Sequence, residues 1–130
     1  MAIVGLGTDI VEIARIEQSL SRSPALIKRV LTENEQQIFQ AMAQNHPGNA
    51  ARYFAKRFAA KEAAAKALGT GIGRGISFQH FNIRNDEFGR PMLELHGAAA
   101  DLAAKLGLRQ TWLSISDEQA FAMATVIFES

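Results

Sequence analysis

One long, alanine-rich stretch constrains this chain more than any other feature, because it predicts a long helix. Asn49 is a typical N-cap residue, and the helix is expected to run from about Ala50 to Leu68. Alanine is the best helix former, and its small side chain lets another backbone pack closely. Gly69 suits the left-handed conformation that commonly ends a helix. We expect this segment to be the central helix of the fold.

Charges are unevenly spread over this helix. Residues 52 to 66 hold one acid, Glu62, and five cations, a net charge of +4: Arg52, Lys56, Arg57, Lys61 and Lys66. At about 100° per residue, Lys61 falls within the apolar stripe formed by Phe54, Phe58, Ala65 and Leu68. A lysine on a buried side needs a partner. Glu62 and Lys66 lie one turn apart on a flank, as an ordinary surface ion pair or as part of a reaction site.

The segment from Ile3 to Ile10 alternates as a β-strand with two different faces. One face is mostly apolar and carries Val4, Leu6, Thr8 and Ile10. The other face is nearly bare, with two glycines, Gly5 and Gly7, and it ends in the carboxylate of Asp9. Glycines in a strand often mark the close approach of a ligand or of another backbone, and the sequence leaves both explanations open.

The remaining segments predict shorter elements. Helices are expected over Glu12–Leu20, over a turn or two after Ser23-Pro24, from the capping box Thr32-Glu33-Asn34-Glu35 to about Gln44, and over Gly97–Gly107. Strands are expected over Phe78–Arg84, Pro91–His96, Thr111–Ser116 and Ala120–Phe128. The last strand is apolar on both faces, which predicts burial inside a sheet or at a subunit contact. Together they predict one compact α+β domain over residues 1–130, an antiparallel sheet with a long central helix and short flanking helices.

Composition excludes several classes of protein. The chain has no cysteine, which removes disulfides, thiolate metal sites and cysteine nucleophiles, and its three histidines match no zinc-binding spacing. A net charge of +1 does not suit a general polyanion binder. The longest mostly apolar run is far shorter than the roughly 20 residues of a membrane span, and the N-terminus lacks the basic start of a signal peptide. We therefore expect a cytoplasmic protein with no membrane or nucleic-acid partner.

Two separated motifs are more specific together than either is alone. The first reads Gly5-Leu6-Gly7-Thr8-Asp9-Ile10-Val11-Glu12, and the second reads Arg57-Phe58-Ala59-Ala60-Lys61-Glu62-Ala63-Ala64-Ala65-Lys66-Ala67-Leu68-Gly69-Thr70-Gly71. In this order and spacing they closely resemble the bacterial holo-[acyl-carrier-protein] synthases, which are small single-domain 4′-phosphopantetheinyl transferases. The resemblance covers essentially the whole chain, including the Gly-Thr-Gly connector and the closing Ala-x-Ala-x-Val-Ile strand.

Members of that family move the phosphopantetheine arm of coenzyme A onto a serine of an apo acyl carrier protein and release adenosine 3′,5′-bisphosphate, a step of fatty acid biosynthesis. The resemblance implies that Asp9 and Glu62 hold Mg²⁺ against the pyrophosphate and that Lys66 stabilises the leaving phosphate. These roles suit the chemistry, because Mg²⁺ commonly takes one or two carboxylates with phosphate and water, and phosphoryl transfer depends on positioning and charge neutralisation. Either Glu62 or a metal-bound water would take the serine proton.

The resemblance also implies contacts with coenzyme A and with the carrier protein. Arg57 and Lys61 are expected to contact phosphate, and Gly69, Thr70 and Gly71 are expected to line the nucleotide site with backbone N–H groups. An acidic carrier protein would meet the cations of the N-terminal helices, which are Arg15, Arg22, Lys28 and Arg29. Family members assemble as homotrimers with coenzyme A between subunits. Many relatives have histidine where this chain has Asp117, so we assign Asp117 no catalytic role.

Two functions of other classes also fit parts of the sequence. A non-catalytic module would bind acidic proteins through the cations between Arg15 and Arg29, and it would need no converging carboxylates. An RNA-binding domain would use the basic helix with Phe78, Phe81 and Phe88, although Phe78 and Phe81 differ in strand parity. Stabilisation by coenzyme A with Mg²⁺ would favour the enzyme, whereas stabilisation by oligonucleotides without metal would favour RNA binding.

Overall fold

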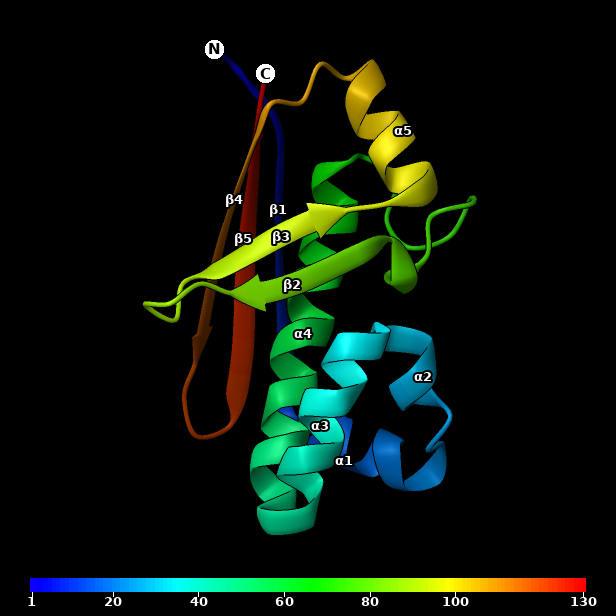
Figure 1. Cartoon of the computed structure of the whole chain (residues 1–130), viewed down its shortest axis with the longest axis vertical. Helices are drawn as coiled ribbons and strands as arrows, with labels where there is room; N and C mark the ends of the chain where they lie inside the picture. The colour runs from blue at the N-terminus through cyan, green and yellow to red at the C-terminus, as the bar shows by residue number, and fades with distance from the viewer.

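A single helix, α4 (Pro47–Ala67), forms the centre of the protein in the computed structural model, which describes all 130 residues. On one side α4 packs against the sheet made by β1 (Ile3–Glu12), β4 (Gln110–Asp117) and β5 (Phe121–Glu129). On its other sides lie α1 (Ile13–Arg22), α2 (Leu26–Val30), α3 (Glu33–Asn45) and the hairpin of β2 (Phe81–Asn85) and β3 (Pro91–Leu95), and the chain termini lie close together at the top of Figure 1. The remaining elements are a 3₁₀ turn, Phe78–His80, and α5 (Gly97–Lys105).

The strands form two antiparallel sheets. The larger has the order β1-β5-β4, with Asp9 opposite Ala124, and the smaller is the β2-β3 hairpin. The predicted α+β class, the antiparallel pairing and the central helix are confirmed. None of the helices is long and apolar enough to cross a membrane.

The two glycines of β1 permit an unusually close contact between the sheet and α4. A Cβ atom added at Gly5 would lie 2.0 Å from the carbonyl oxygen of Ala67, and one added at Gly7 would lie 1.9 Å from that of Ala63. Any side chain at these positions would push the strand off the helix. The bare face of the strand therefore meets another backbone, which decides between the two explanations that the sequence left open.

Both ends of α4 follow from local chemistry, although one was predicted wrongly. The helix ends as expected, with Gly69 at φ +87° after the cap residue Leu68. It begins at Pro47, with His46 as the N-cap, so the prediction that Asn49 caps it is wrong. Proline is favoured in the first helical turn, where its missing N–H has no helical acceptor to lose.

The segment Phe78–His80 is a 3₁₀ turn and not the start of a strand. The Ser77 hydroxyl accepts a hydrogen bond from the Gln79 backbone N–H at 3.0 Å, and His80 Nδ1 accepts one from the Ser77 N–H at 3.1 Å. These local side-chain bonds compete with strand pairing, so β2 begins only at Phe81.

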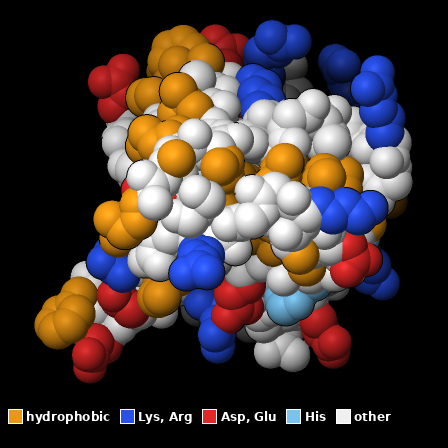
Figure 2. Space-filling view, turned by 90° about the horizontal axis from the view of Figure 1, so that it is seen from above, with side chains coloured by type: hydrophobic (Ala, Val, Ile, Leu, Met, Phe, Trp, Pro, Cys, Tyr) orange, Lys and Arg blue, Asp and Glu red, His pale blue; other side chains and the backbone are white.

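The two faces of the larger sheet differ in how they are covered. On the inner face of β5, Ala122, Ala124, Val126 and Phe128 are fully buried against the core. The outer face is open and carries large apolar side chains: Leu6, Ile10, Trp112, Phe121 and Met123, which are 40 to 64% exposed. β5 is the central strand of the sheet, but only one of its faces is buried within one chain, so the predicted burial of both faces is not confirmed. Figure 2, seen from above, shows hydrophobic side chains over the upper left and across the middle of this face, with side chains of both charge signs around them.

Candidate active site

The core of the site forms where β1 crosses the C-terminal half of α4. Asp9 has the same strand parity as Gly5 and Gly7, so its side chain faces the helix. The Lys66 ammonium lies 3.1 Å from Asp9 Oδ1 and also donates to the Thr8 carbonyl oxygen at 2.9 Å. The Asp9 side chain is 17% exposed and that of Lys66 is 50% exposed, so this ion pair is at the edge of the protein and open to ligands.

Glu62 completes this group one helical turn before Lys66. It is half-buried, and burial is the main cause that raises its pKa. The negative charge of Asp9 raises this pKa further, while the positive charge of Lys66 lowers it. The structure thus brings together the three residues that were predicted to react, Asp9, Glu62 and Lys66.

Two neighbouring carboxylates of this kind fit a magnesium ion. Mg²⁺ is commonly held by one or two carboxylates, with phosphate and water oxygens as the other ligands. No group of three or more His, Asp or Glu side chains in the chain is placed to hold a metal ion, so a metal bound here would need oxygens from its substrate or from water. Repulsion between the two carboxylates is the second cause that raises the pKa of Glu62. A divalent cation bound beside them would relieve this repulsion.

Lys61, which was predicted to contact phosphate, lies on a different side of α4. Its side chain is fully buried, and its ammonium donates at 2.6 Å to both Glu35 Oε1 and the Val30 carbonyl oxygen. The partner expected for a buried lysine is therefore Glu35. The prediction of a phosphate contact at Lys61 is corrected, because an ammonium with no exposed surface and two protein acceptors does not face the nucleotide.

Glu35 is the polar residue of this region whose role the sequence did not reveal. The capping box correctly placed it at the start of α3, where Glu35 Oε1 accepts the Thr32 N–H at 2.9 Å. A capping glutamate is usually exposed, so the pattern gave no sign of a second, buried partner 26 residues further along the chain.

Arg57 is also buried, but its charge has no opposite partner. Its guanidinium donates to Asn85 Oδ1 at 2.6 Å and lies 4.6 Å from the centre of the Tyr53 ring, while its Nε has no hydrogen-bond partner. It forms no ion pair, and only 5% of the residue is exposed.

The glycine-rich connector has a different role from the one predicted. The backbone N–H of Gly69 donates to the Lys66 carbonyl oxygen at 2.9 Å, and those of Thr70 and Gly71 both donate to the Ala65 carbonyl oxygen, at 3.3 and 3.0 Å. These N–H groups cap the helix and are not free for phosphate, which corrects the predicted nucleotide contacts of the connector. A helix C-terminus also carries partial negative charge, which leaves Lys66 as the group here that attracts anions.

Sequence and structure comparisons now identify the family. The family described as the 4′-phosphopantetheinyl transferase superfamily (ACPS) matches residues 5–126. A holo-[acyl-carrier-protein] synthase of Vibrio vulnificus is 56% identical over 131 residues, which covers 100% of both chains. The chain belongs to the 4′-phosphopantetheinyl transferase superfamily. The predicted family and the predicted class of enzyme are confirmed.

Solved structures of this family have the same fold. Holo-[acyl-carrier-protein] synthase of Neisseria meningitidis superposes with a TM-score of 0.87 at 38% identity, and covers 99% of this chain and 100% of that one. The Bacillus anthracis enzyme, solved in complex with coenzyme A (3′,5′-ADP), gives a TM-score of 0.80 at 39% identity, with 98% and 97% covered. The phosphopantetheinyl transferase fold is confirmed, and this transferase is of the holo-[acyl-carrier-protein] synthase type.

The other cations of this transferase are dispersed. Arg52 and Lys56 contact Asp117 at 3.0 and 3.5 Å, and Arg52 also donates to the Glu118 and Gln119 carbonyl oxygens. Arg52 and Lys56 thus share Asp117, whereas Arg57, Lys61 and Lys66 each contact other residues. Because Arg57 and Lys61 are buried, the five cations of α4 form no continuous basic surface. The cations of the N-terminal helices, in contrast, are all exposed and form no ion pair within the chain: Arg15, Arg22, Lys28 and Arg29.

Two of the three aromatic residues that the RNA-binding hypothesis requires are buried. Phe78 is 7% exposed and Phe81 is fully buried, and both belong to hydrophobic cores. Of the three predicted aromatic residues, only Phe88, which is 87% exposed, is free to stack on a base. A single aromatic residue without a basic helix surface does not form a stacking platform.

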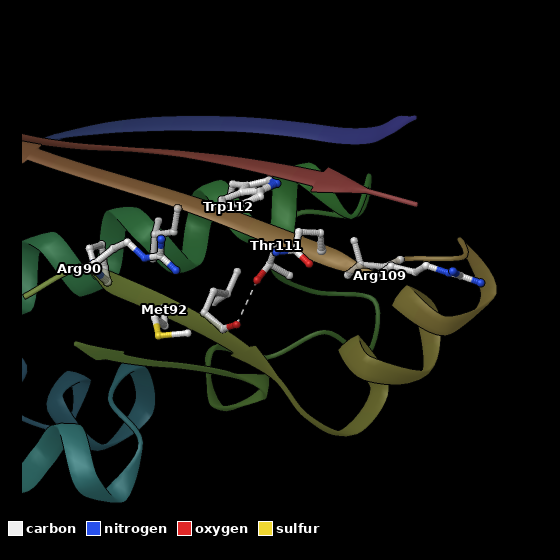
Figure 3. Close-up of a pocket in the computed structure, with 10 residues that line it drawn as sticks. Arg90, Met92, Arg109, Thr111 and Trp112 are labelled. Atoms are coloured by element: carbon white, nitrogen blue, oxygen red, sulfur yellow. Dashed lines mark hydrogen bonds between the residues drawn. The ribbon is translucent and has the colours of Figure 1, made fainter. Parts of the chain in front are cut away.

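A groove separate from the Asp9 cluster runs between β3 and β4. It has a volume of about 290 Å³, with Arg90 and Arg109 toward its two ends and Met92 and Thr111 between them (Figure 3). The Thr111 hydroxyl donates to the Leu93 carbonyl oxygen at 3.3 Å across this groove. Because β4 and β1 are at opposite edges of the larger sheet, none of the predicted site residues lines the groove.

Proposed function

We propose that this transferase moves the 4′-phosphopantetheine group from coenzyme A to a serine of apo acyl carrier protein in a magnesium-dependent reaction and releases adenosine 3′,5′-bisphosphate. The observation that carries this proposal is the convergence of Asp9, Glu62 and Lys66 at one open edge between β1 and α4. Coenzyme A complexes among the structural relatives, including the enzyme of Helicobacter pylori, support coenzyme A as the donor.

In this proposal Asp9 and Glu62 hold the magnesium ion, which when bound supplies charge neutralisation for the pyrophosphate. Lys66 is half exposed, so its ammonium can contact the phosphate that leaves as well as Asp9. Burial and the charge of Asp9 raise the pKa of Glu62, and a cation bound beside the two carboxylates would favour the ionised form of Glu62. The serine proton goes to Glu62 or to water, and these alternatives stay open.

Arg57 remains an expected phosphate contact in addition to Lys66, whereas Lys61 is no longer one. A buried guanidinium without a carboxylate partner is costly unless an anion completes it. Arg57 has such an environment, since its only polar partner is the neutral Asn85 side chain. We assign Arg57 to a phosphate of coenzyme A on this ground.

The carrier protein is proposed to dock on the N-terminal helices. Acyl carrier proteins are acidic in this family, and the four exposed cations there have no internal partner to compete with it. Charges at the rim of an interface mainly speed association and direct its orientation.

The open face of the larger sheet supports the homotrimer that the family resemblance implies. The exposed side chains form cross-strand rows, with Leu6 opposite Ile127 and Ile10 opposite Met123. Trp112 extends the first row from β4, because it also lies opposite Ile127. An apolar face of this kind is typical of a subunit contact. Light scattering of the pure protein tests the trimer, and a monomeric mass would contradict it; the cytoplasmic location stays a prediction.

The reaction is tested by the intact mass of apo acyl carrier protein after incubation with this protein, coenzyme A and Mg²⁺. We expect a mass gain equal to the phosphopantetheine arm, together with adenosine 3′,5′-bisphosphate in the supernatant. The gain should disappear with EDTA and in Glu62→Ala. A folded protein that gives no gain with several carrier proteins would contradict the proposal.

A further inference from the structure

The buried ion pair between Glu35 and Lys61 connects four elements of the fold. Lys61 on α4 donates to Glu35 on α3 and to the carbonyl oxygen of Val30, the last residue of α2. Glu35 in turn accepts the backbone N–H of Thr32 through Oε1 and that of Ile83 on β2 through Oε2, at 2.9 and 2.8 Å. Both side chains are fully buried, and each makes at least two hydrogen bonds.

Stability alone is a weak reason for such a pair. Removing two charges from water costs about as much free energy as their attraction returns, and apolar residues of similar volume often replace buried pairs without loss. Burial does lower the pKa of Lys61, although the charge of Glu35 opposes this effect. What the pair does provide is directional contact, because each hydrogen bond forms at only one relative placement of α2, α3, α4 and β2.

The pair fixes the position of the proposed carrier-protein contacts relative to the residues proposed to react with coenzyme A. Glu62 follows Lys61 directly and points about 100° away from it around α4, toward β1. The other partner of Lys61, Val30, follows Lys28 and Arg29, two of the exposed cations proposed to meet the carrier protein. Figure 1 shows the α2–α3 junction beside α4 on the side away from the larger sheet.

A second contact holds the same junction from outside. The side-chain amide of Gln79 donates to the carbonyl oxygens of Lys28 and Leu31, both at 2.8 Å. Gln36 donates to the Leu31 carbonyl oxygen as well, also at 2.8 Å. Residues 28–32 are therefore held by two sets of hydrogen bonds. Lys61 and Glu35 form one set in the core, and the side chains of Gln36 and Gln79 form the other.

We propose that Glu35 and Lys61 are positioning residues that hold the carrier-protein docking segment around Lys28 at a fixed place relative to Glu62 and Lys66. This inference rests on the proposed function. Its consequence is specific: loosening the pair weakens the productive use of the carrier protein more than the use of coenzyme A, because Asp9, Glu62 and Lys66 lie on the other side of α4.

The test compares two double variants in steady-state kinetics, with coenzyme A and apo acyl carrier protein varied separately. Glu35→Gln with Lys61→Met removes the buried pair without leaving a lone charge, and methionine keeps the volume of the lysine stem. Glu33→Gln with Lys105→Met is the matched control, because it removes one acid and one base that are both exposed. We expect the KM for the carrier protein to rise several-fold in the first variant only. The KM for coenzyme A should change less in that variant, because only Arg57 among its proposed contacts lies near the pair, and should stay unchanged in the control.

Thermal unfolding of the same samples separates positioning from mere folding. If the first variant melts like the control and both KM values equal those of the wild type, the pair has no positioning role and the inference is wrong. Equal losses for both substrates also contradict it, because the effect would not be specific to the docking segment. A wild-type protein that transfers nothing would instead contradict the proposed function.

Gln79→Met provides a second variant in case the buried pair is required for folding. Gln79 is exposed, so its substitution leaves no buried charge and loosens the same segment from outside. We expect the same direction of change, a higher KM for the carrier protein with an unchanged KM for coenzyme A. An unchanged KM for the carrier protein in a folded Gln79→Met variant would overturn the inference.

Discussion

Lys61 and Glu62 are neighbours in the same motif but lie in opposite environments. Lys61 is fully buried between α4 and α3, with an ion pair and a backbone acceptor. Glu62 is half-buried beside a second carboxylate, and it has a raised pKa. The lysine has an ion-pair partner and a backbone acceptor within the chain, whereas the glutamate lies beside a second negative charge that a bound cation would offset.

This difference shows how to separate a structural charge from a reactive one within a single motif. A charged group whose hydrogen bonds are complete inside the protein has little left to offer a ligand. A group that is partly open and electrostatically unfavourable is a better candidate for binding or catalysis. By this criterion the proposed site lies on the β1 side of α4, and the charged pair on the α3 side is structural.

The largest expected effect comes from breaking the buried pair on one side only. Lys61→Met leaves the Glu35 carboxylate buried without its counter-ion, and we expect a loss of about 3–5 kcal/mol in the free energy of unfolding. Urea unfolding monitored by circular dichroism measures it. Glu62→Gln is the matched variant one residue away, and its stability should stay close to that of the wild type. Equal losses in the two variants would remove the distinction drawn between the two sides.

The next effect tests the close contact on the strand side of α4. Gly7→Ala places a Cβ where the Ala63 carbonyl oxygen lies within 1.9 Å, so strand and helix must separate. Overpacking of this kind typically costs about 1–3 kcal/mol, and we also expect weaker binding of Mg²⁺ with coenzyme A, because Asp9 moves with the strand. Gly48→Ala is the control, since an added Cβ there meets nothing within 4 Å. A Gly7→Ala protein with wild-type stability and binding would show that the contact has no role in the site.

The sequence predicted the elements well wherever the signal was periodic or local. The capping box fixed the start of α3, and Gly69 marked the end of α4. The sequence failed where the outcome depended on contacts between distant segments. It could not choose a partner for Lys61, since Glu35 is 26 residues away and already had a local explanation.

The candidate site shows the same division between local signals, which the sequence revealed, and contacts between distant segments, which it did not. Asp9, Glu62 and Lys66 were found through motif spacing, and their convergence is a property of the fold. The N–H groups of the Gly69–Gly71 connector were misassigned because glycines suit both phosphate loops and helix caps. Only the hydrogen-bond pattern at Ala65 and Lys66 distinguishes the two.

A smaller effect concerns the pH dependence of stability. Because the pKa of Glu62 is raised above its usual value near 4.5, the folded protein keeps a proton that the unfolded chain loses. The contribution of Glu62 to the free energy of unfolding should therefore fall as the pH rises from 4.5 through its raised pKa. Urea unfolding over this range measures the slope, which Glu62→Gln should remove.

Asp9→Asn sharpens this measurement, because the Asp9 charge is the second cause of the shift. In that variant the pKa of Glu62, followed by NMR, should move back toward its usual value but not reach it, since burial remains the largest cause. A pKa that is unaffected by Asp9→Asn would show that the two carboxylates do not interact, which would weaken the case for a shared metal ion.

The smallest effect concerns the exposed counterpart of the buried pair on the same helix. Asp117 contacts Arg52 and Lys56, and these side chains are about one-third exposed. Water and salt screen such pairs, so Asp117→Asn should cost only about 0.2–1 kcal/mol, less still at high ionic strength. Arg52 also keeps its bonds to the Glu118 and Gln119 carbonyl oxygens, so the β4–β5 turn stays attached to α4. Urea unfolding of Asp117→Asn and Lys61→Met in low and high salt measures how far salt reduces each loss in the free energy of unfolding. If salt reduced both losses equally, burial would not be what makes the Lys61–Glu35 pair different from the pairs of Asp117 with Arg52 and Lys56.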